Sequence, residues 1–269
     1  MDKVQLSIVT ISLNAAQTIS ETINSVCNQT FSGFEYIIKD GLSEDKTIEI
    51  ASSYKDIFKE KGIDFYIIEK KDSGIYDAMN QALELCKGTW IMFLNSGDSL
   101  YDEGVLNCIF GGQKSYIADC IYGNTVNVKE NVEYVKKGYP ISSIYYRVPF
   151  IHQASFIKRE AMERYKFDLR YQIAADYDVY ARMFDDGLKF SYIDCNIARF
   201  DLAGVSQTNR NKAQYEVGSI QREHGYYKKS IIKRIWFNQF IVRLKGSRIV
   251  YILYAKFKRR MSIIHKEFE

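Results

Sequence analysis

Three aspartates follow short apolar runs in the first part of the chain. They are Asp40 in YIIKDGLS, Asp72 in IIEKKDSGIYDAMN and Asp98 in WIMFLNSGD. The segments between these runs have helical spacing, as in an α/β sheet, where ligands bind beyond the carboxyl ends of the strands. Carboxylates gathered there would suit a divalent cation and the polar edge of a nucleotide. The pattern therefore indicates a nucleotide-dependent enzyme.

Each aspartate also has a purely structural interpretation. Asp98 closes the turn NSGD, where it could hold Mg²⁺ or Mn²⁺ against the phosphates of a leaving nucleotide. Ser-Gly-Asp is equally a common turn sequence. Asp40 could accept a hydrogen bond from a base or a ribose hydroxyl, or simply end a strand in a turn. The sequence alone leaves both interpretations open.

Two further segments place acidic residues at helix starts. In DSGIYDAMNQA, Asp72 begins a helix, and Asp77 and Asn80 share one face of it. Capping explains Asp72 but gives no reason for Asp77 and Asn80. In YQIAADYDVYARMF, Asp176 and Asp178 lie at a helix N-terminus, which favours negative charge. Either could act as a general base or as a helix cap.

The elements that must position these residues alternate along the chain. Thr18 and Glu21 form a capping-box pattern at the start of the first helix. The order β-α-β-α-β-α-β predicts a mixed, mainly parallel sheet with helices on both faces. The strands expected in this half are Leu6–Ile11, Glu35–Lys39, Phe65–Ile68 and Trp90–Leu94. Beyond them we expect strands and turns in 116–140, strands Phe150–Ile157 and Phe190–Ile193, and a helix Ala175–Phe184.

The composition is that of an ordinary globular protein. The chain has 269 residues, of which 46% are hydrophobic and 26% charged. Its five cysteines include no CxxC pair, which argues against a disulfide framework or a zinc site. The short N-terminal apolar stretch predicts a buried strand rather than a signal peptide.

The C-terminal segment is strongly basic. Residues 224–269 hold twelve Lys and Arg against two Glu, a charge of +10, which leaves −6 on residues 1–223 of the total +4. Apolar residues there have helical spacing, but the longest apolar run, Ile249–Ala255, is shorter than the about 20 residues that a membrane span needs. We expect basic amphipathic helices on an anionic membrane surface. The alternatives are that this segment forms a pair of helices packed on the rest of the chain, or that it binds nucleic acid.

Five motifs in order resemble the inverting family 2 glycosyltransferases with the GT-A fold, which build bacterial capsule, O-antigen and exopolysaccharide. They are TISLN (10–14), SVCNQT (25–30), YIIKDGLSEDKT (36–47), DSGIYDAMNQA (72–82) and FLNSGD (93–98). The resemblance covers roughly residues 4–206. It implies a GT-A domain over 1–223, with a nucleotide-binding half in about 1–100 and an acceptor half in about 101–223. Residues 224–269 would form a basic helical extension.

The resemblance also implies roles in donor binding. Asp40 would contact the uracil or ribose of a UDP-sugar, and Thr10 and Asn14 would line the nucleotide pocket. Asp72 and Asp77 would bound the donor site.

The metal would bind Asp98, the aspartate of a DxD-type motif. Asn95 stands where many members have an acidic residue, so a single carboxylate would hold Mn²⁺ or Mg²⁺ together with the donor phosphates.

On the acceptor side, an inverting transfer needs a carboxylate that takes the proton of the attacking hydroxyl. The resemblance implies Asp176 as this base, with Asp178 as the alternative. His152 and Gln153 in HQASF would bind sugar hydroxyls. The QxxRW motif of processive members is absent, which indicates one sugar addition per encounter.

The expected function is therefore transfer of one sugar from a nucleotide-sugar, UDP-linked by preference, to a polyprenyl-pyrophosphate-linked saccharide. The enzyme would be cytoplasmic and peripheral at the inner face of the bacterial membrane. A nucleotidyltransferase is one alternative, but TISLNAAQT lacks the Gly-rich, Arg-containing loop that such an enzyme needs after its first strand. A catalytically inactive nucleotide- or sugar-binding module is the other.

Overall fold

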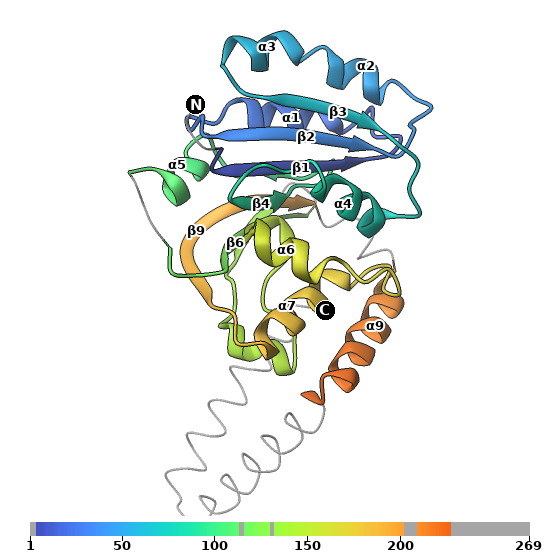
Figure 1. The fold of residues 1–269 in the computed structure, drawn as a ribbon, viewed down its shortest axis with the longest axis vertical. Helices are drawn as coiled ribbons and strands as arrows, with labels where there is room; N and C mark the ends of the chain where they lie inside the picture. The colour runs from blue at the N-terminus through green and yellow to red at the C-terminus, as the bar shows by residue number, and fades with distance from the viewer. Residues whose placement is uncertain (1–3, 113–115, 130–131, 202–208, 227–269) are drawn as a thin grey trace, which may run out of the picture. The chain divides into compact units, whose positions relative to one another are not determined.

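A computed structural model describes residues 4–112, 116–129, 132–201 and 209–226 (Figure 1). The chain divides into two compact units, residues 1–220 and 221–269, and the first holds the sheet. The strands are β1 Leu6–Ser12, β2 Phe34–Asp40, β3 Phe65–Glu69, β4 Trp90–Phe93, β5 Ser99–Leu100, β6 Cys120–Lys129, β7 Val132–Lys136, β8 Ser155–Lys158 and β9 Phe190–Asp201. The helices are α1 Ile19–Cys27, α2 Thr47–Ser52, α3 Lys55–Glu60, α4 Ile75–Leu83, α5 Val105–Phe110, α6 Arg159–Tyr165, α7 Ala175–Asp185 and α9 Arg210–Glu223, with 3-10 turns η1 Ile141–Tyr145 and η2 His152–Ala154.

The described strands form one mixed sheet in the order β3-β2-β1-β4-β8-β6-β9-β5, and β7 pairs with β6. Strands β1 to β4 are parallel, with Ser12 at the end of β1 opposite Asp40 at the end of β2. Their carboxyl ends therefore meet at one edge, as the apolar runs predicted. The mixed, mainly parallel architecture expected from the sequence is confirmed.

The second half of the sheet brings later segments back to this edge. Strand β8 is antiparallel to both β4 and β6, while β6 and β9 run parallel with a bulge near Asn124. Because β8 lies beside β4, the turn η2 just before β8 lies near the turn that follows β4. Sequence-distant residues 95–98 and 152–154 are thereby brought together.

The core explains why these segments form strands and helices. The first strand buries Leu6, Ile8 and Val9, and α1 buries Ile19 and Ile23 against the sheet. In Figure 1, α2 and α3 lie beyond β3, and α4 lies below β1 and to the right of β4.

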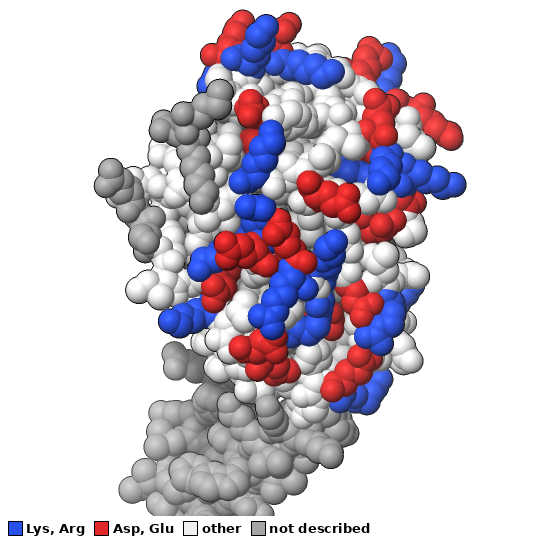
Figure 2. All heavy atoms as spheres, in the orientation of Figure 1, with Lys and Arg blue, Asp and Glu red and all other residues white. Residues whose placement is uncertain are grey.

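The visible surface in Figure 2 intersperses Lys and Arg with Asp and Glu, without a large patch of one sign.

Several local expectations were wrong. The strand expected over Phe150–Ile157 begins only at Ser155, because residues 152–154 form η2. No side-chain cap forms at Thr18, whose hydroxyl contacts the Ala15 carbonyl and Ser96 Oγ instead. The expectations for residues 227–269 lie outside the described residues.

Candidate functional site

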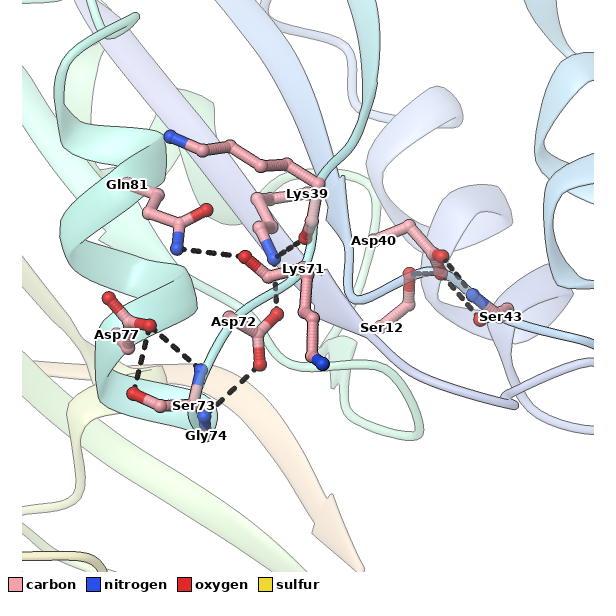
Figure 3. Close-up of polar contacts among 11 residues, drawn as sticks. Ser12, Lys39, Asp40, Ser43, Lys71, Asp72, Ser73, Gly74, Asp77 and Gln81 are labelled. Atoms are coloured by element: carbon pink, nitrogen blue, oxygen red, sulfur yellow. Dashed lines mark hydrogen bonds and ion pairs between the residues drawn. The ribbon is translucent and has the colours of Figure 1, made fainter.

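Asp40 is fully buried at the end of β2 and has protein partners for both carboxylate oxygens. Oδ2 accepts hydrogen bonds from Ser12 Oγ at 2.7 Å and Ser43 Oγ at 2.6 Å, and Oδ1 accepts one from the Ser43 backbone N–H at 2.6 Å (Figure 3). The strand end and the turn after it are thus tied together. In this arrangement Asp40 shapes the sheet edge through Ser43.

Ser43 in turn holds Asn14 in place through hydrogen bonds. The Asn14 N–H donates to Ser43 Oγ at 2.8 Å, and Asn14 Oδ1 accepts from the Glu44 N–H at 2.9 Å. Thr10, by contrast, is fully buried, and its hydroxyl donates to the Leu94 carbonyl at 2.8 Å. The structure therefore places Asn14 on the exposed edge, while Thr10 connects β1 to the segment that follows β4.

Asp72 forms an ion pair with a buried lysine that the sequence analysis did not single out. Lys39 Nζ bonds the Asp72 carboxylate and donates to the Lys70 carbonyl at 2.5 Å. The other Asp72 oxygen accepts from the Gly74 N–H at 3.1 Å (Figure 3). A Cβ at Gly41 would lie 3.0 Å from Asp72 Oδ2, so glycine lets this carboxylate reach the end of β2.

Asp77 and Asn80 have structural partners that were not evident from spacing. Asp77 Oδ2 accepts hydrogen bonds from the Ser73 N–H at 2.8 Å and the Ser73 hydroxyl at 2.9 Å, and the backbone bond is the main cause that lowers its pKa. Asn80 bonds both backbone groups of Phe167, each at 2.9 Å. Asp77 therefore connects the first turn of α4 to the loop before it, and Asn80 connects a later loop to α4.

The turn that carries Asp98 is held by α1. Thr22 Oγ1 donates to the Asp98 carbonyl at 2.7 Å and accepts from the Gly97 N–H at 3.0 Å. Gly97 has a φ of +96°, which other residues rarely adopt. The buried Asp98 carboxylate is thereby fixed just beyond β4.

The adjacent residues His152 and Gln153 connect the two carboxylates on which the chemistry was expected to depend. Gln153 Nε2 donates to Asp98 Oδ2 at 2.8 Å. His152 Nδ1 lies 3.3 Å from Asp176 Oδ2, and its Nε2 lies 3.2 Å from Asn95 Nδ2. A continuous polar chain therefore runs from the turn after β4 through η2 to the start of α7.

Asp176 faces a cavity, whereas Asp178 is committed to an ion pair. The single hydroxyl proton of Tyr76 is shared between the Ile173 carbonyl, 2.7 Å from Oη, and Asp176 Oδ1, 3.2 Å from Oη. Burial raises the pKa of Tyr76 well above its usual value, and the Asp176 charge raises it further. Asp178 accepts from Arg182 Nε at 2.8 Å. The geometry favours Asp176 over Asp178 as a base.

A second carboxylate, that of Glu216 on α9, holds the loop before Asp176. It accepts backbone hydrogen bonds from Gln172 at 3.1 Å, Ile173 at 2.8 Å and Ala174 at 3.0 Å. These N–H groups lead directly into α7, where an anion is favoured by the helix dipole. Glu216 is buried, so α9 anchors the loop that directly precedes Asp176.

The cavity beside Asp176 has a volume of about 190 Å³. It is lined by residues of α4, β7, η2, α7, β9 and α9 and by the loops between them: Tyr76, Lys136, Val148, Phe150, Ile151, His152, Gln153, Ile173, Ala174, Asp176, Phe200, Ala213 and Val217. Its wall is mostly apolar, and its polar groups gather around Asp176 and η2. Such a cavity suits a small ligand held by a few oriented polar contacts.

Oxygen atoms around Asp98 fit a hard divalent cation. Asn95 Oδ1 and Gln153 Oε1 are buried and accept no hydrogen bond, although both residues contact the Asp98–Asp176 chain. Mg²⁺ and Mn²⁺ prefer carboxylate, amide and phosphate oxygens. The described residues contain no group of three or more His, Cys, Asp or Glu that could hold a metal ion without other ligands.

Three residues of this region were not predicted from the sequence: Lys39, Tyr76 and Glu216. Lys39 lies in a strand that also contains the charged residues Glu35 and Asp40, so its charge alone did not distinguish it. Tyr76 lies within the motif DSGIYDAMNQA but resembles a core residue by its spacing. Nothing in the local sequence of α9 marks Glu216, because its partners lie before α7.

Comparisons with known proteins identify the family to which the chain belongs. A profile of the family described as Glycosyl transferase family 2 matches residues 7–176. The chain is 30% identical over 207 residues to a PGL/p-HBAD biosynthesis glycosyltransferase of Mycobacterium tuberculosis, covering 75% of this chain and 79% of that protein. It is 26% identical over 220 residues to the amylovoran biosynthesis glycosyltransferase AmsB of Erwinia amylovora, covering 75% and 71%.

Solved structures share the fold. S. aureus TarS 1–349 in complex with UDP superposes with a TM-score of 0.63 at 17% identity, over 82% of this chain and 65% of that one. Glucosyl-3-phosphoglycerate synthase from Mycobacterium tuberculosis, in complex with Mn²⁺, UDP and phosphoglyceric acid, gives 0.57 at 13% identity, over 82% and 78%. With the family profile spanning most of the sheet and its site, the chain belongs to glycosyl transferase family 2 and has the GT-A fold.

Proposed function

We propose that this glycosyltransferase moves one sugar per encounter, with inversion at the anomeric carbon, from a UDP-sugar to a saccharide acceptor in bacterial surface-polysaccharide synthesis. The observation that carries the proposal is that two adjacent residues of η2 contact both carboxylates, Gln153 bonding Asp98 and His152 contacting Asp176. This pair of residues joins the expected diphosphate side of the sheet edge to a cavity that suits an acceptor. The leaving diphosphate and the attacking hydroxyl would thus both be positioned through residues of η2.

On the acceptor side, Asp176 would take the proton of the attacking hydroxyl. Its carboxylate is oriented by Tyr76 and by His152, which leaves it facing the cavity. The high pKa of Tyr76 keeps that hydroxyl protonated and donating. Orientation of the base in this way is what general base catalysis requires.

On the donor side, Asp98, Asn95 and Gln153 would hold Mn²⁺ or Mg²⁺ with their oxygens. A cation there would neutralise the departing diphosphate. Asn14, Asp72 and Asp77 lie at or near the strand ends where the nucleotide would bind, with Asp40 ordering that edge through Ser43. Support for the UDP and Mn²⁺ assignment comes from structural neighbours crystallised with these ligands.

We further propose a polyprenyl-pyrophosphate-linked saccharide as acceptor and a peripheral position at the inner membrane face, mediated by residues 224–269. The charge of this segment supports the proposal. No helix in the described part of the chain is long and apolar enough to cross a membrane. Flotation with anionic vesicles, but not with neutral ones or in high salt, is the expected result. Binding to DNA in place of vesicles would contradict it.

The first test is nucleotide release from UDP-, GDP- and dTDP-sugars, with Mn²⁺ or with EDTA. UDP release that requires metal is expected, and Asp98→Asn should lower it by at least about 100-fold. Asp102→Asn removes an exposed carboxylate a few residues away and should retain activity. A nucleotidyltransferase would instead release pyrophosphate, and an inactive binding module would bind UDP without turnover.

A second test addresses the base. Asp176→Asn should abolish transfer to a membrane lipid extract while UDP affinity stays unchanged, because the amide cannot take a proton. The control is Asp185→Asn, an exposed residue at the other end of α7. Full transfer by Asp176→Asn would show that the base lies elsewhere.

A further inference from the structure

One cationic side chain lines the acceptor cavity and a second lies next to a lining residue, and neither has a carboxylate partner among the described residues. Lys136, the last residue of β7, lines the same cavity as His152 and Asp176 but forms no ion pair or hydrogen bond through its side chain there. Arg147 directly precedes Val148, which also lines the cavity. Its guanidinium lies over the Tyr139 ring at 4.3 Å and forms no ion pair with the described residues.

The neighbouring lysine shows what an ordinary pairing looks like in the same strand end. Lys137 Nζ bonds Asp194 Oδ2 at 2.9 Å, and this contact raises the pKa of Lys137. Lys136 is affected in the opposite direction. Desolvation lowers its pKa, and the positive charge of Arg147 lowers it further.

The negative group already present in the cavity does not neutralise Lys136. The Asp176 carboxylate is engaged by Tyr76 and His152, and no ion pair joins it to Lys136. Lys136 and Arg147 are both exposed to solvent, so a ligand entering the cavity can reach them. An anion bound beside them would offset the repulsion between their like charges.

We propose that Lys136 and Arg147 form a subsite for an oxyanion, a phosphate or carboxylate, carried by the acceptor beside the hydroxyl that Asp176 deprotonates. This inference rests on the proposed function. Arg147, held flat on Tyr139, offers a planar donor fork that matches such groups, and Lys136 adds a point charge. The cavity of about 190 Å³ suits a ligand of the size of one sugar residue.

The test measures binding of three small probes by NMR titration, with UDP saturating the donor site. α-D-glucose 1-phosphate and D-glucuronate carry the anion, and methyl α-D-glucoside is the neutral match. The wild-type enzyme should bind at least one charged probe at least about tenfold more tightly than the neutral one. Preference for the phosphate would indicate a sugar phosphate as the source, and preference for glucuronate an acidic sugar.

Lys136→Gln and Arg147→Gln should each weaken the charged probe at least about tenfold and leave the neutral probe unchanged. Lys137→Gln is the matched control, because it removes a lysine that is already paired. Equal affinity for charged and neutral probes, no detectable binding of either charged probe, or unchanged binding in both variants would overturn the subsite.

Failure of the subsite can be told apart from failure of the proposed function. UDP binding and release from the donor panel are measured on the same samples, with thermal unfolding as a check of folding. Normal donor turnover without a charge preference would remove only the subsite. Absence of donor turnover with a charge preference lost in Lys136→Gln would retain the anion subsite and remove the transferase proposal.

Discussion

At the scale of single residues, the site depends on side chains that orient other side chains. Thr22 is one of them: its single hydroxyl both donates to the Asp98 carbonyl and accepts from the Gly97 N–H. It is fully buried, so water cannot replace it readily. The Asp98 carboxylate is therefore positioned from α1, well before the motif that carries it.

Thr22→Val should preserve shape but leave these two backbone groups unpaired. We expect a loss of about 1–3 kcal/mol in the free energy of unfolding and a larger metal concentration for half-maximal donor turnover. Urea unfolding and a Mn²⁺ titration measure the two effects. Thr22→Ser keeps the hydroxyl and should retain metal dependence; a Ser variant as impaired as the Val variant would argue against the hydrogen-bond role.

Glu216 has the same kind of role toward Asp176. Glu216→Gln retains size but removes the charge that accepts three backbone hydrogen bonds. We expect kcat for transfer to fall about tenfold or more through misplacement of the base, with KM for the donor unchanged. Glu163→Gln, which disrupts a surface pair with Arg159, is the control. A change confined to donor KM would contradict this role.

At the scale of elements, the parallel strands and the helices between them could be predicted, because apolar periodicity and turn residues determine them locally. The later part could not be read as accurately. The segment from Phe150 has the composition of a strand, yet residues 152–154 turn because His152 and Gln153 bond to the 95–98 turn and Asp176. Such bonds join distant residues and leave no local pattern.

The site was predictable to a similar degree. Asp98 and Asp176 were singled out from strand and helix ends, and the structure brings them to one polar chain. The sequence could not show that Asp40 and Asp77 have protein partners, since those partners depend on turn geometry. It also gave no sign of Lys39 as a partner of Asp72.

The pairing of β6 with β9 provides a test by pH. Asn124 donates to Asp194 Oδ1 at 2.8 Å, and this bond, with Lys137 and Tyr192, lowers the pKa of Asp194 to about 2. A folded pKa below the usual 3.8 means stability that is present above that value and lost as the pH falls toward 2.

Asp194→Asn should therefore have a lower Tm than wild type near neutral pH, with the difference shrinking between about pH 4 and 2. Calorimetry over this range measures it. Glu103→Gln, at an exposed carboxylate, should show no such convergence. A Tm difference that stays constant down to the lowest pH would contradict the assignment.

At the scale of the whole molecule, the proposed metal site has one carboxylate and two amide oxygens and would need the donor phosphates to complete it. We therefore expect Mn²⁺ alone to leave Tm unchanged, and Mn²⁺ with UDP to raise it above UDP alone. A ligand at 100 times its Kd adds about 2.7 kcal/mol to the free energy of unfolding.

Differential scanning fluorimetry with EDTA as the reference distinguishes the cases. The increase from Mn²⁺ with UDP should be lost in Asp98→Asn and retained in Asp102→Asn. A large rise with Mn²⁺ alone would indicate a metal site that is complete without donor.

The hydrogen bonds between Glu216 of α9 and the loop before α7 have a consequence for folding during protein synthesis. Glu216 leaves the ribosome after every described strand of the sheet, since β9 ends at Asp201. A nascent chain can pair these strands and bury its core before the loop that leads to Asp176 has its anchor. The proposed base Asp176 would thus be held in place only after the described sheet has formed.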